Sequence, residues 1–398
     1  MINSLKSDVF ITGAARTPLG NFQGALASTP ATELGATAIS AAVDRSGLDS
    51  SDIEYSVMGN LLSSGLGQTP ARQSAIKAGI PASASALTIN KACASGMQAI
   101  ILATQSIQLG EASAVVAGGM ENMSAAPHLL LNSRTGQRLG DTNLVDSMIH
   151  DGLWCPFENR HMGSSAEAIS EKYSVSREAQ DEFSERSHRL ASTASAEGSF
   201  ASETTPVEVV GRRGKIAIVD VDEGPRADTT LDGLARLPAV FPPNATVTPG
   251  NASSISDGAA AVVVVNEIQA SASSSGPVAR ITGYAHAANE PGMLFDAPRI
   301  AVANLLEKTG QTIDDFDLIE VNEAFAAQVL ANGQAVNWDW DRVNQRGGAI
   351  ALGHPIGASG SRIIVTLMYG LQAIRGISGL AVICHAGGGA VAMSISLQ

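Results

Sequence analysis

A cysteine set among small residues is the first candidate for chemistry. Cys93 lies in Asn90–Gly96, which reads NKACASG, between an expected strand and an expected helix that begins near Ala94. Free backbone amides at a helix N-terminus favour the thiolate, which is the nucleophilic form of cysteine. The small neighbours leave room for a substrate. A buried structural cysteine is the alternative interpretation.

A histidine lies in a long run that is rich in glycine and alanine. His354 is followed by Pro355 within Gly347–Gly360, which reads GGAIALGHPIGASG. A neutral imidazole there can take a proton from a thiol or donate to an oxyanion, so we expect a general base. A structural histidine is the alternative. The run lacks the GxxxxGK[ST] spacing of a phosphate-binding loop, which disfavours a nucleotide site.

A second cysteine ends another expected strand. Cys384 begins the sequence CHAGGG, in which a glycine turn follows the strand. A thiol at a strand terminus is a candidate acid/base. Neighbouring side chains on a strand point to opposite faces, so we expect His385 to lie outside the pocket of Cys384, as a structural or exposed histidine.

Asn322 and Glu323 follow the expected strand Leu318–Val321, in the sequence NEAFA. Catalytic groups in open α/β sheets often lie at the carboxyl ends of strands. Asn322 as a helix N-cap and Glu323 as a first-turn carboxylate are the alternatives. Together with the two cysteines and the histidine, this pair supplies a nucleophile, a base, a second acid/base and an oxyanion donor without a metal.

Short apolar runs alternate with helical patterns, which predicts an α/β fold with βαβ units and strands covered on both faces. Expected helices include Met97–Leu109, Ser176–Ala196 and Arg362–Ile374; Ala179, Phe183 and Leu190 share one face of the second. The expected strands are Val9–Gly13, Tyr55–Met58, Ala86–Asn90, Ala112–Ala117, Ala259–Val265, Val278–Ala285, Leu318–Val321, Gly379–Cys384 and Ala390–Leu397.

Two parts of the chain share an order of elements. Cys93–Gly96 and Gly357–Gly360 both contain Ala-Ser-Gly, and each precedes an expected helix and an expected strand. The strands are followed by glycine turns, at Gly118–Gly119 and Gly387–Gly389 respectively. This order predicts a duplicated half. Residues 122–248 are more polar and are expected to form an insertion that folds over the sheets.

Composition excludes several classes of protein. The 398 residues are 44% hydrophobic and carry a net charge of −13, which predicts a large core and argues against nucleic-acid binding. Three cysteines far apart form neither a disulfide framework nor a zinc pattern. The N-terminus does not read as a signal peptide and no segment reads as a membrane span. We therefore expect a soluble cytoplasmic protein.

The motifs together resemble the thiolases, the acyl-CoA C-acetyltransferases, over essentially the whole chain. NKACASGMQA, NEAFA, GGAIALGHPIGASG and CHAGGG carry the resemblance, and AARTPLG, HMG, SREAQDEF and TPGNASSISDGAA add to it in the expected order. The resemblance implies two βαβαβ-type halves that form a five-layered αβαβα core. It assigns residues 1–121 and 251–273 to the N-terminal half, 122–250 to a loop domain, and 274–398 to the C-terminal half.

The resemblance also implies a role for each site residue. Cys93 would be the acylated nucleophile and His354 its base. Asn322 would hold a water that, with His354, forms a first oxyanion hole. Cys384 would handle the α-proton of a second acetyl group. The amides of Cys93 and Ala386 would form a second oxyanion hole. The residues expected to contact the CoA thioester are Arg226, Ser253, His161, Met162 and Phe325.

Three positions depart from the family pattern. Ala386 stands where a glycine is usual, and we expect a negative φ there because the three following glycines can form the sharp part of the turn. Asn289–Pro298, NEPGMLFDAP, differs from the usual glycine-rich segment. Pro249 stands where short-chain members often carry alanine.

The expected activity is the reversible condensation of two acetyl-CoA to acetoacetyl-CoA and CoA. His161 and Met162 resemble a pair that limits acyl length in the short-chain members. A degradative, broad-chain 3-ketoacyl-CoA thiolase is the first alternative, and a non-catalytic lipid carrier or scaffold is the second. We expect CoA thioesters as substrates, no cofactor, and a homodimer or a dimer of dimers.

Overall fold

The computed structural model describes residues 7–398 except 137, 212–213, 242–244 and 273–275. Within these residues a ten-stranded sheet runs in the order β14-β15-β16-β13-β1-β12-β5-β3-β4, with β2 paired to β12. The N-terminal half supplies β1 (Val9–Arg16), β2 (Gly20–Asn21), β3 (Tyr55–Gly59), β4 (Ser85–Ile89), β5 (Ala114–Asn122) and β12 (Ser256–Asn266). The C-terminal half supplies β13 (Ala279–Ala288), β14 (Leu318–Val321), β15 (Ser378–His385) and β16 (Gly389–Leu397).

The two halves meet at β1 and β13, which pair only at Phe10 and Ile11. β3 is parallel to β4 and β5, β14 is parallel to β15, and the other pairs are antiparallel. The expected strands are all present. The expected boundary between residues 273 and 274 lies outside the described residues.

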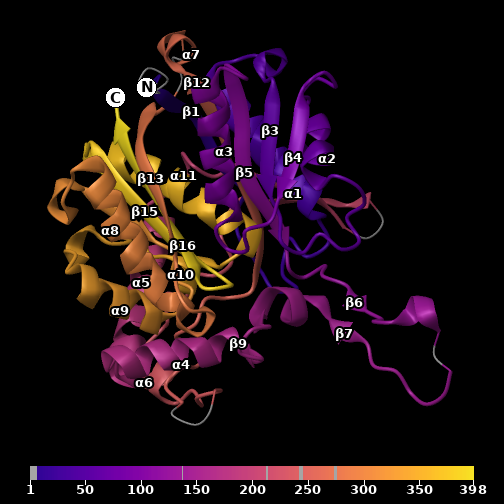
Figure 1. The fold of residues 1–398 in the computed structure, drawn as a ribbon, viewed down its shortest axis with the longest axis vertical. Helices are drawn as coiled ribbons and strands as arrows, with labels where there is room; N and C mark the ends of the chain where they lie inside the picture. The colour runs from indigo at the N-terminus through magenta and orange to yellow at the C-terminus, as the bar shows by residue number, and fades with distance from the viewer. Residues whose placement is uncertain (1–6, 137, 212–213, 242–244, 273–275) are drawn as a thin grey trace.

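The helices and the sheet halves form five layers (Figure 1). α3 (Ser95–Leu109) and α11 (Ile356–Ile374) share one core with strands of both halves. α1 (Ala31–Ser46) and α2 (Pro70–Lys77) cover the outer face of the N-terminal half. α8 (Ala297–Thr309) and α9 (Ala326–Val336) cover that of the C-terminal half. The predicted αβαβα core is confirmed.

Glycines allow the two central helices to approach closely. A Cβ at Gly96 would lie 2.6 Å from the backbone nitrogen of Ser361, and one at Gly360 would lie 2.5 Å from that of Met97. Side chains larger than hydrogen at either glycine would therefore force α3 and α11 apart. The two Ala-Ser-Gly elements of the predicted duplication thus pack on each other.

The polar middle of the chain forms hairpins and helices beside the core. Figure 1 shows the β6–β7 hairpin projecting away from the sheets, and α4 and α6 below the C-terminal half. The elements are β6 (His128–Leu129), β7 (Val145–Asp146), β8 (Trp154–Cys155), β9 (Arg160–His161), β10 (Val207–Val210), β11 (Ile216–Val219), α4 (Met162–Tyr173), α5 (Arg177–Ala196) and α6 (Leu231–Ala235).

Short elements complete the fold. α7 (Glu267–Ala272) follows β12, and α10 (Ala349–Leu352) precedes the turn that carries His354. Among the residues that the structure describes, further short helical segments are η1 (Ser50–Asp52), η2 (Ser133–Thr135), η3 (Met148–Leu153), η5 (Pro291–Asp296), η6 (Ile313–Asp315) and η7 (Trp340–Arg342). In the described part of the chain, no helix combines the length and the hydropathy that a membrane span requires.

One local prediction was wrong. Gly118 and Gly119 do not form a turn: they lie inside β5, where a Cβ at Gly119 would collide with the carbonyl oxygen of Gly357. On α5, Phe183 is buried and Ala179 and Leu190 are half-buried, which agrees with the predicted shared face. Most of the buried face of α5 is polar, because it packs through side-chain hydrogen bonds.

Candidate active site

The turn before α3 is built by side-chain hydrogen bonds and carries Cys93. Ser95 Oγ accepts from the Lys91 N–H (2.8 Å) and donates to the Ala92 carbonyl (2.6 Å). Asn90 Oδ1 accepts from the Ala92 N–H (3.0 Å). Ala92 has a φ of 46°, in the left-handed region that costs a non-glycine residue about 1–2 kcal/mol. The turn therefore fixes the position of Cys93 before the helix, and the backbone strain lies at Ala92.

The contacts of His354 determine which ring nitrogen carries the proton. Its Nδ1 lies 2.5 Å from Ser359 Oγ, and that hydroxyl also bonds the Pro355 carbonyl at 2.9 Å. A carbonyl only accepts, so the single hydroxyl proton of Ser359 goes to Pro355. Nδ1 of His354 must then be the donor to Ser359. This leaves Nε2 with a free lone pair, as a general base requires.

Cys384 is the penultimate residue of β15 and is 1% exposed. Ala386 is absent from the residues with positive φ, while Gly387 (φ 87°) and Gly388 (φ 94°) have left-handed conformations. The expected negative φ at Ala386 is therefore confirmed, and the glycines form the sharp part of the turn. His385 bonds the Ala386 carbonyl through Nδ1 (2.8 Å) and does not line the cavity beside Cys384, as predicted.

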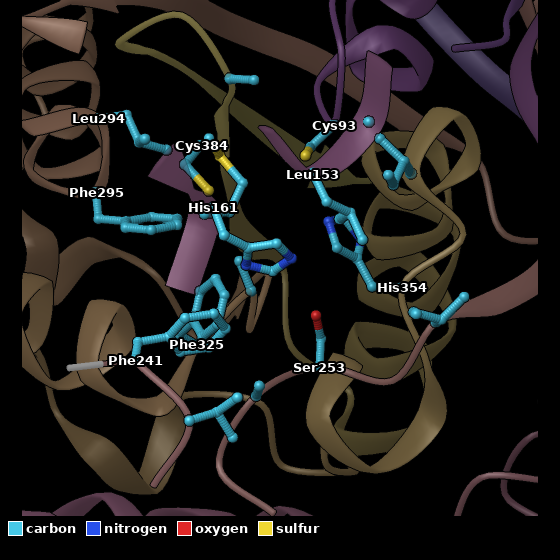
Figure 2. A pocket seen from close by; sticks show the side chains of 18 of the residues that line it. Cys93, Leu153, His161, Phe241, Ser253, Leu294, Phe295, Phe325, His354 and Cys384 are labelled. Carbon is cyan, nitrogen blue, oxygen red and sulfur yellow. The ribbon is translucent and has the colours of Figure 1, made fainter. Parts of the chain in front are cut away.

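A cavity of about 250 Å³ brings most of the predicted site together. Cys93, His354, Cys384 and Ala386 all line it. Figure 2 shows the sulfur atoms of both cysteines and the imidazole of His354 facing the cavity. The predicted substrate contacts Ser253, His161, Met162 and Phe325 also line it.

Burial sets the protonation of the thiols. Burial raises the pKa of Cys93 to about 12, against the smaller opposite effect of the N–H groups of Cys93 and Ala386. Burial also raises the pKa of Cys384 well above its usual value, and the nearby Cys93 raises it further. The backbone amides favour the thiolate, as expected, but in the free protein the loss of solvation outweighs their effect.

The imidazole is neutral in the same state. Burial, together with the nearby Arg362 guanidinium, lowers the pKa of His354 to about 3. The free site thus holds two neutral thiols and one neutral base. The backbone N–H groups of Cys93 and Ala386 lower the pKa of the Cys93 thiol, so they favour negative charge that develops on this sulfur during a reaction.

Asn322 is buried but does not line the cavity. Its backbone N–H donates to the Val382 carbonyl (3.0 Å), and its side-chain amide has no hydrogen-bond partner within the described part of the protein. α9 begins at Ala326 with Phe325 as its N-cap, so the N-cap interpretation of Asn322 is wrong. A fully buried amide without a partner is costly unless water or a ligand satisfies it.

Glu323 is not a first-turn carboxylate either. It is completely buried and accepts from Ser187 Oγ (2.7 Å), Asn344 Nδ2 (2.8 Å) and the Ile350 N–H (3.1 Å). These donors come from α5, the loop before α10, and α10 itself. Glu323 therefore fixes the segment after β14 to the segment that leads to His354.

Sequence reasoning missed Glu121, which ties the two halves together beside the site. Its carboxylate accepts from Asn60 Nδ2 (2.8 Å) and from the N–H groups of Leu61 (3.0 Å), Leu62 (3.1 Å) and Gly357 (2.9 Å). Burial raises its pKa to about 7. The only sequence signal was an acidic residue at the end of an apolar strand.

The predicted CoA contacts are divided between the cavity and the surface. His161 stacks on Phe241 with ring centroids 4.9 Å apart and caps α4 by accepting from the Gly163 N–H (3.1 Å). Met162 begins α4 and is buried. Arg226 is exposed, lies outside the cavity lining, and donates its backbone N–H to His188 Nδ1 (3.3 Å).

Comparisons with known proteins agree with this geometry. Residues 9–268 match the thiolase N-terminal domain and residues 275–397 match the thiolase C-terminal domain. An acetyl-CoA acetyltransferase of Pseudomonas aeruginosa is 47% identical over 98% of this chain and 99% of its own length. One from Cupriavidus necator is also 47% identical over the same shares. The crystal structure of the Bacillus anthracis acetyl-CoA acetyltransferase superposes with a TM-score of 0.96 at 38% identity, over 98% of this chain and 99% of that one. The similarity covers almost the full length of a chain whose core has this architecture and whose cavity holds two cysteines and a histidine. The chain therefore belongs to the thiolase family.

Proposed function

We propose that this protein is an acetyl-CoA C-acetyltransferase, which condenses two acetyl-CoA to acetoacetyl-CoA and CoA and catalyses the reverse thiolysis. The observation that carries the proposal is the pair of thiols, Cys93 and Cys384, in one cavity with the free Nε2 of His354. One thiol serves as nucleophile and the other as acid/base, which is what a two-step carbon–carbon condensation requires.

The first half-reaction acylates Cys93. Nε2 of His354 takes the proton of Cys93 as the sulfur attacks the thioester carbonyl. The C–S bond to CoA then breaks, and Cys384 gives its proton to the departing CoA sulfur. This leaves acyl-Cys93, a protonated His354 and a Cys384 thiolate. The N–H groups of Cys93 and Ala386 stabilise the oxyanion.

The second half-reaction forms the carbon–carbon bond. The Cys384 thiolate removes the α-proton of a second acetyl-CoA, and His354 with water on the Asn322 amide stabilises the enolate. The enolate attacks acyl-Cys93, the bond from carbon to Cys93 breaks, and His354 returns its proton to Cys93. Every group regains its starting proton. The role of Asn322 is supported by its buried, unpartnered amide.

Substrate binding uses the insertion and the loops around the cavity. Ser253 and Phe325 contact the acyl-pantetheine, and His161 and Met162 limit the acyl chain to short lengths. Arg226 lies at the surface, where it contacts the adenine end of CoA. We include in the proposal the division into two halves and a loop domain at residues 122–250, a homodimeric or tetrameric assembly, a cytoplasmic location, and catalysis without a cofactor.

The alternatives make different predictions for the same cavity. A broad-chain 3-ketoacyl-CoA thiolase needs room for a long acyl chain, whereas the cavity is small. A non-catalytic carrier would have no need for Cys93, His354 and Cys384 together. Short-chain acetyl transfer is the function that these residues support best.

Mass spectrometry and isotope exchange test the proposal. Acetyl-CoA should add one acetyl group to the peptide of Cys93, and Cys93→Ser should abolish it. Cys384→Ala should keep acetylation but lose both condensation and hydrogen–deuterium exchange at the acetyl α-carbon. Acetylation of Cys155 or Cys384 instead, or near wild-type condensation by Cys384→Ala, would contradict the assignment.

A further inference from the structure

The segment that departs from the family pattern forms one wall of the cavity. η5 contributes Leu294 and Phe295, each 2% exposed, to the lining. Figure 2 shows both on the side of the cavity opposite Cys93 and His354. Val240 is 49% exposed, and Pro249 is also exposed. The mouth of the cavity therefore lies at the exposed residues, and its blind end lies at η5.

Two aromatic rings close that blind end. Phe295 and Phe325 meet edge to face with ring centroids 5.3 Å apart and an interplanar angle of 69°. Both rings share one core with Cys384 and Leu294. Because protein interiors are close-packed, an acyl chain extending past Cys384 must displace one of these side chains.

The backbone of the wall is held from neighbouring elements. Asn332 of α9 donates from Nδ2 to the Phe295 carbonyl (2.9 Å). The Asn289 N–H, on the segment before η5, donates to the Gly388 carbonyl (2.6 Å) in the turn after Ala386. The wall is thus fixed to the helix after the NEAFA sequence and to the turn after Cys384.

Asp296, the last residue of η5, strengthens this attachment. Its carboxylate is 1% exposed and accepts from Tyr173 Oη (2.6 Å), Lys172 Nζ (2.9 Å), and Arg299 Nε and Nη2 (2.7 and 2.8 Å). Asn289 Nδ2 adds a longer contact (3.4 Å). These donors come from α4, α8 and the segment before η5, so η5 cannot move without breaking several charged contacts.

We propose that Phe295 is a specificity-determining residue that admits short acyl chains and excludes longer ones, and that Asp296 is the positioning residue that keeps Phe295 in place. The inference rests on the proposed acyl transfer and adds the residue that sets the upper limit of its substrate class. It differs from the limit expected of His161 and Met162, which come from β9 and the start of α4.

Chain-length selectivity tests the proposal more directly than total activity. kcat/KM is measured for acetoacetyl-CoA and for 3-ketooctanoyl-CoA, and the eight-carbon to four-carbon ratio is compared among variants. Each methylene in an apolar pocket changes discrimination by about 10- to 200-fold. Phe295→Ala and Phe295→Leu should therefore raise the ratio about tenfold or more, and Asp296→Asn should raise it by a smaller factor.

The matched control is Phe316→Leu, which removes the same atoms from a ring that is fully buried in another core of the same half. General loss of packing lowers both rates and leaves the ratio unchanged, so Phe316→Leu should behave in this way. Intact mass provides a second readout: octanoyl-CoA should acylate Cys93 in Phe295→Leu and not in the wild type. Phe295→Leu carries the test if Phe295→Ala does not fold.

Each outcome decides one point. An unchanged ratio in Phe295→Leu, or wild-type cleavage of the eight-carbon substrate as fast as the four-carbon one, overturns the role of Phe295. A raised ratio in Phe295→Leu with an unchanged ratio in Asp296→Asn overturns only the role of Asp296. Wild-type protein that fails to cleave acetoacetyl-CoA contradicts the proposed function itself, which separates the two failures.

Discussion

Ser359→Ala should weaken His354 as a base, and the replaced side chain acts through His354 and not through the substrate. Ser359 Oγ is the acceptor that keeps the proton of His354 on Nδ1, at 2.5 Å, in a site where both residues are buried. The variant leaves a buried N–H without a partner, which costs about 1–3 kcal/mol. The tautomer with its proton on Nδ1, which is the form that can act as a base, is destabilised by the same free energy. We therefore expect kcat/KM for thiolysis to fall by about 5- to 160-fold.

Ser361→Ala is the matched control for this change. Ser361 lies two residues further along α11, is equally buried, and bonds the carbonyls of Ala260 (3.0 Å) and Ala358 (2.9 Å) instead of His354. Both variants lose a buried hydroxyl, so similar losses of stability in urea are expected. Acylation of Cys93 by acetyl-CoA, followed by intact mass, should slow only in Ser359→Ala. Equal acylation rates in the two variants would refute the assigned tautomer.

Two further predictions concern Ala386 and Cys93. Ala386→Gly should leave kcat/KM within about twofold and lower the free energy of unfolding by about 0.4–1 kcal/mol, because the native φ suits alanine and glycine adds chain entropy; a tenfold gain in activity would contradict this. The rate at which iodoacetamide alkylates Cys93 of the free protein should rise about tenfold for each pH unit up to pH 10. Only the thiolate reacts, and the pKa of the thiol is raised to about 12. A plateau of the alkylation rate near pH 8.5 would show an unperturbed thiol.

The sequence was sufficient to predict the strands because most are apolar runs bounded by polar residues. β14 has the predicted bounds, Leu318–Val321, since Asp317 and Asn322 flank it. β5 was predicted too short, because Gly118 and Gly119 read as a turn. The carbonyl of Gly357, which makes glycine necessary at 119, belongs to a contact between distant parts of the chain that local propensity cannot reveal.

The same distinction applies to the site. Cys93, His354 and Cys384 were predicted because each lies within or directly before a segment rich in glycine and alanine. The protonation of Cys93 was not, because the helix terminus is a local feature whereas burial depends on the whole cavity. The roles of Ser359 and Glu323 also escaped, since serine and glutamate at such positions are ordinary helix and loop residues until their partners are known.

The position of the nucleophile relative to its base depends on contacts between the two halves. Cys93 precedes a helix of the N-terminal half and His354 precedes a helix of the C-terminal half, and these helices touch through Gly96 and Gly360. Glu121 adds a hydrogen bond from the N-terminal half to the Gly357 N–H, three residues after His354. Neither loop alone fixes the distance between thiol and imidazole. The packing of α3 on α11 therefore sets the position of the nucleophile relative to its base.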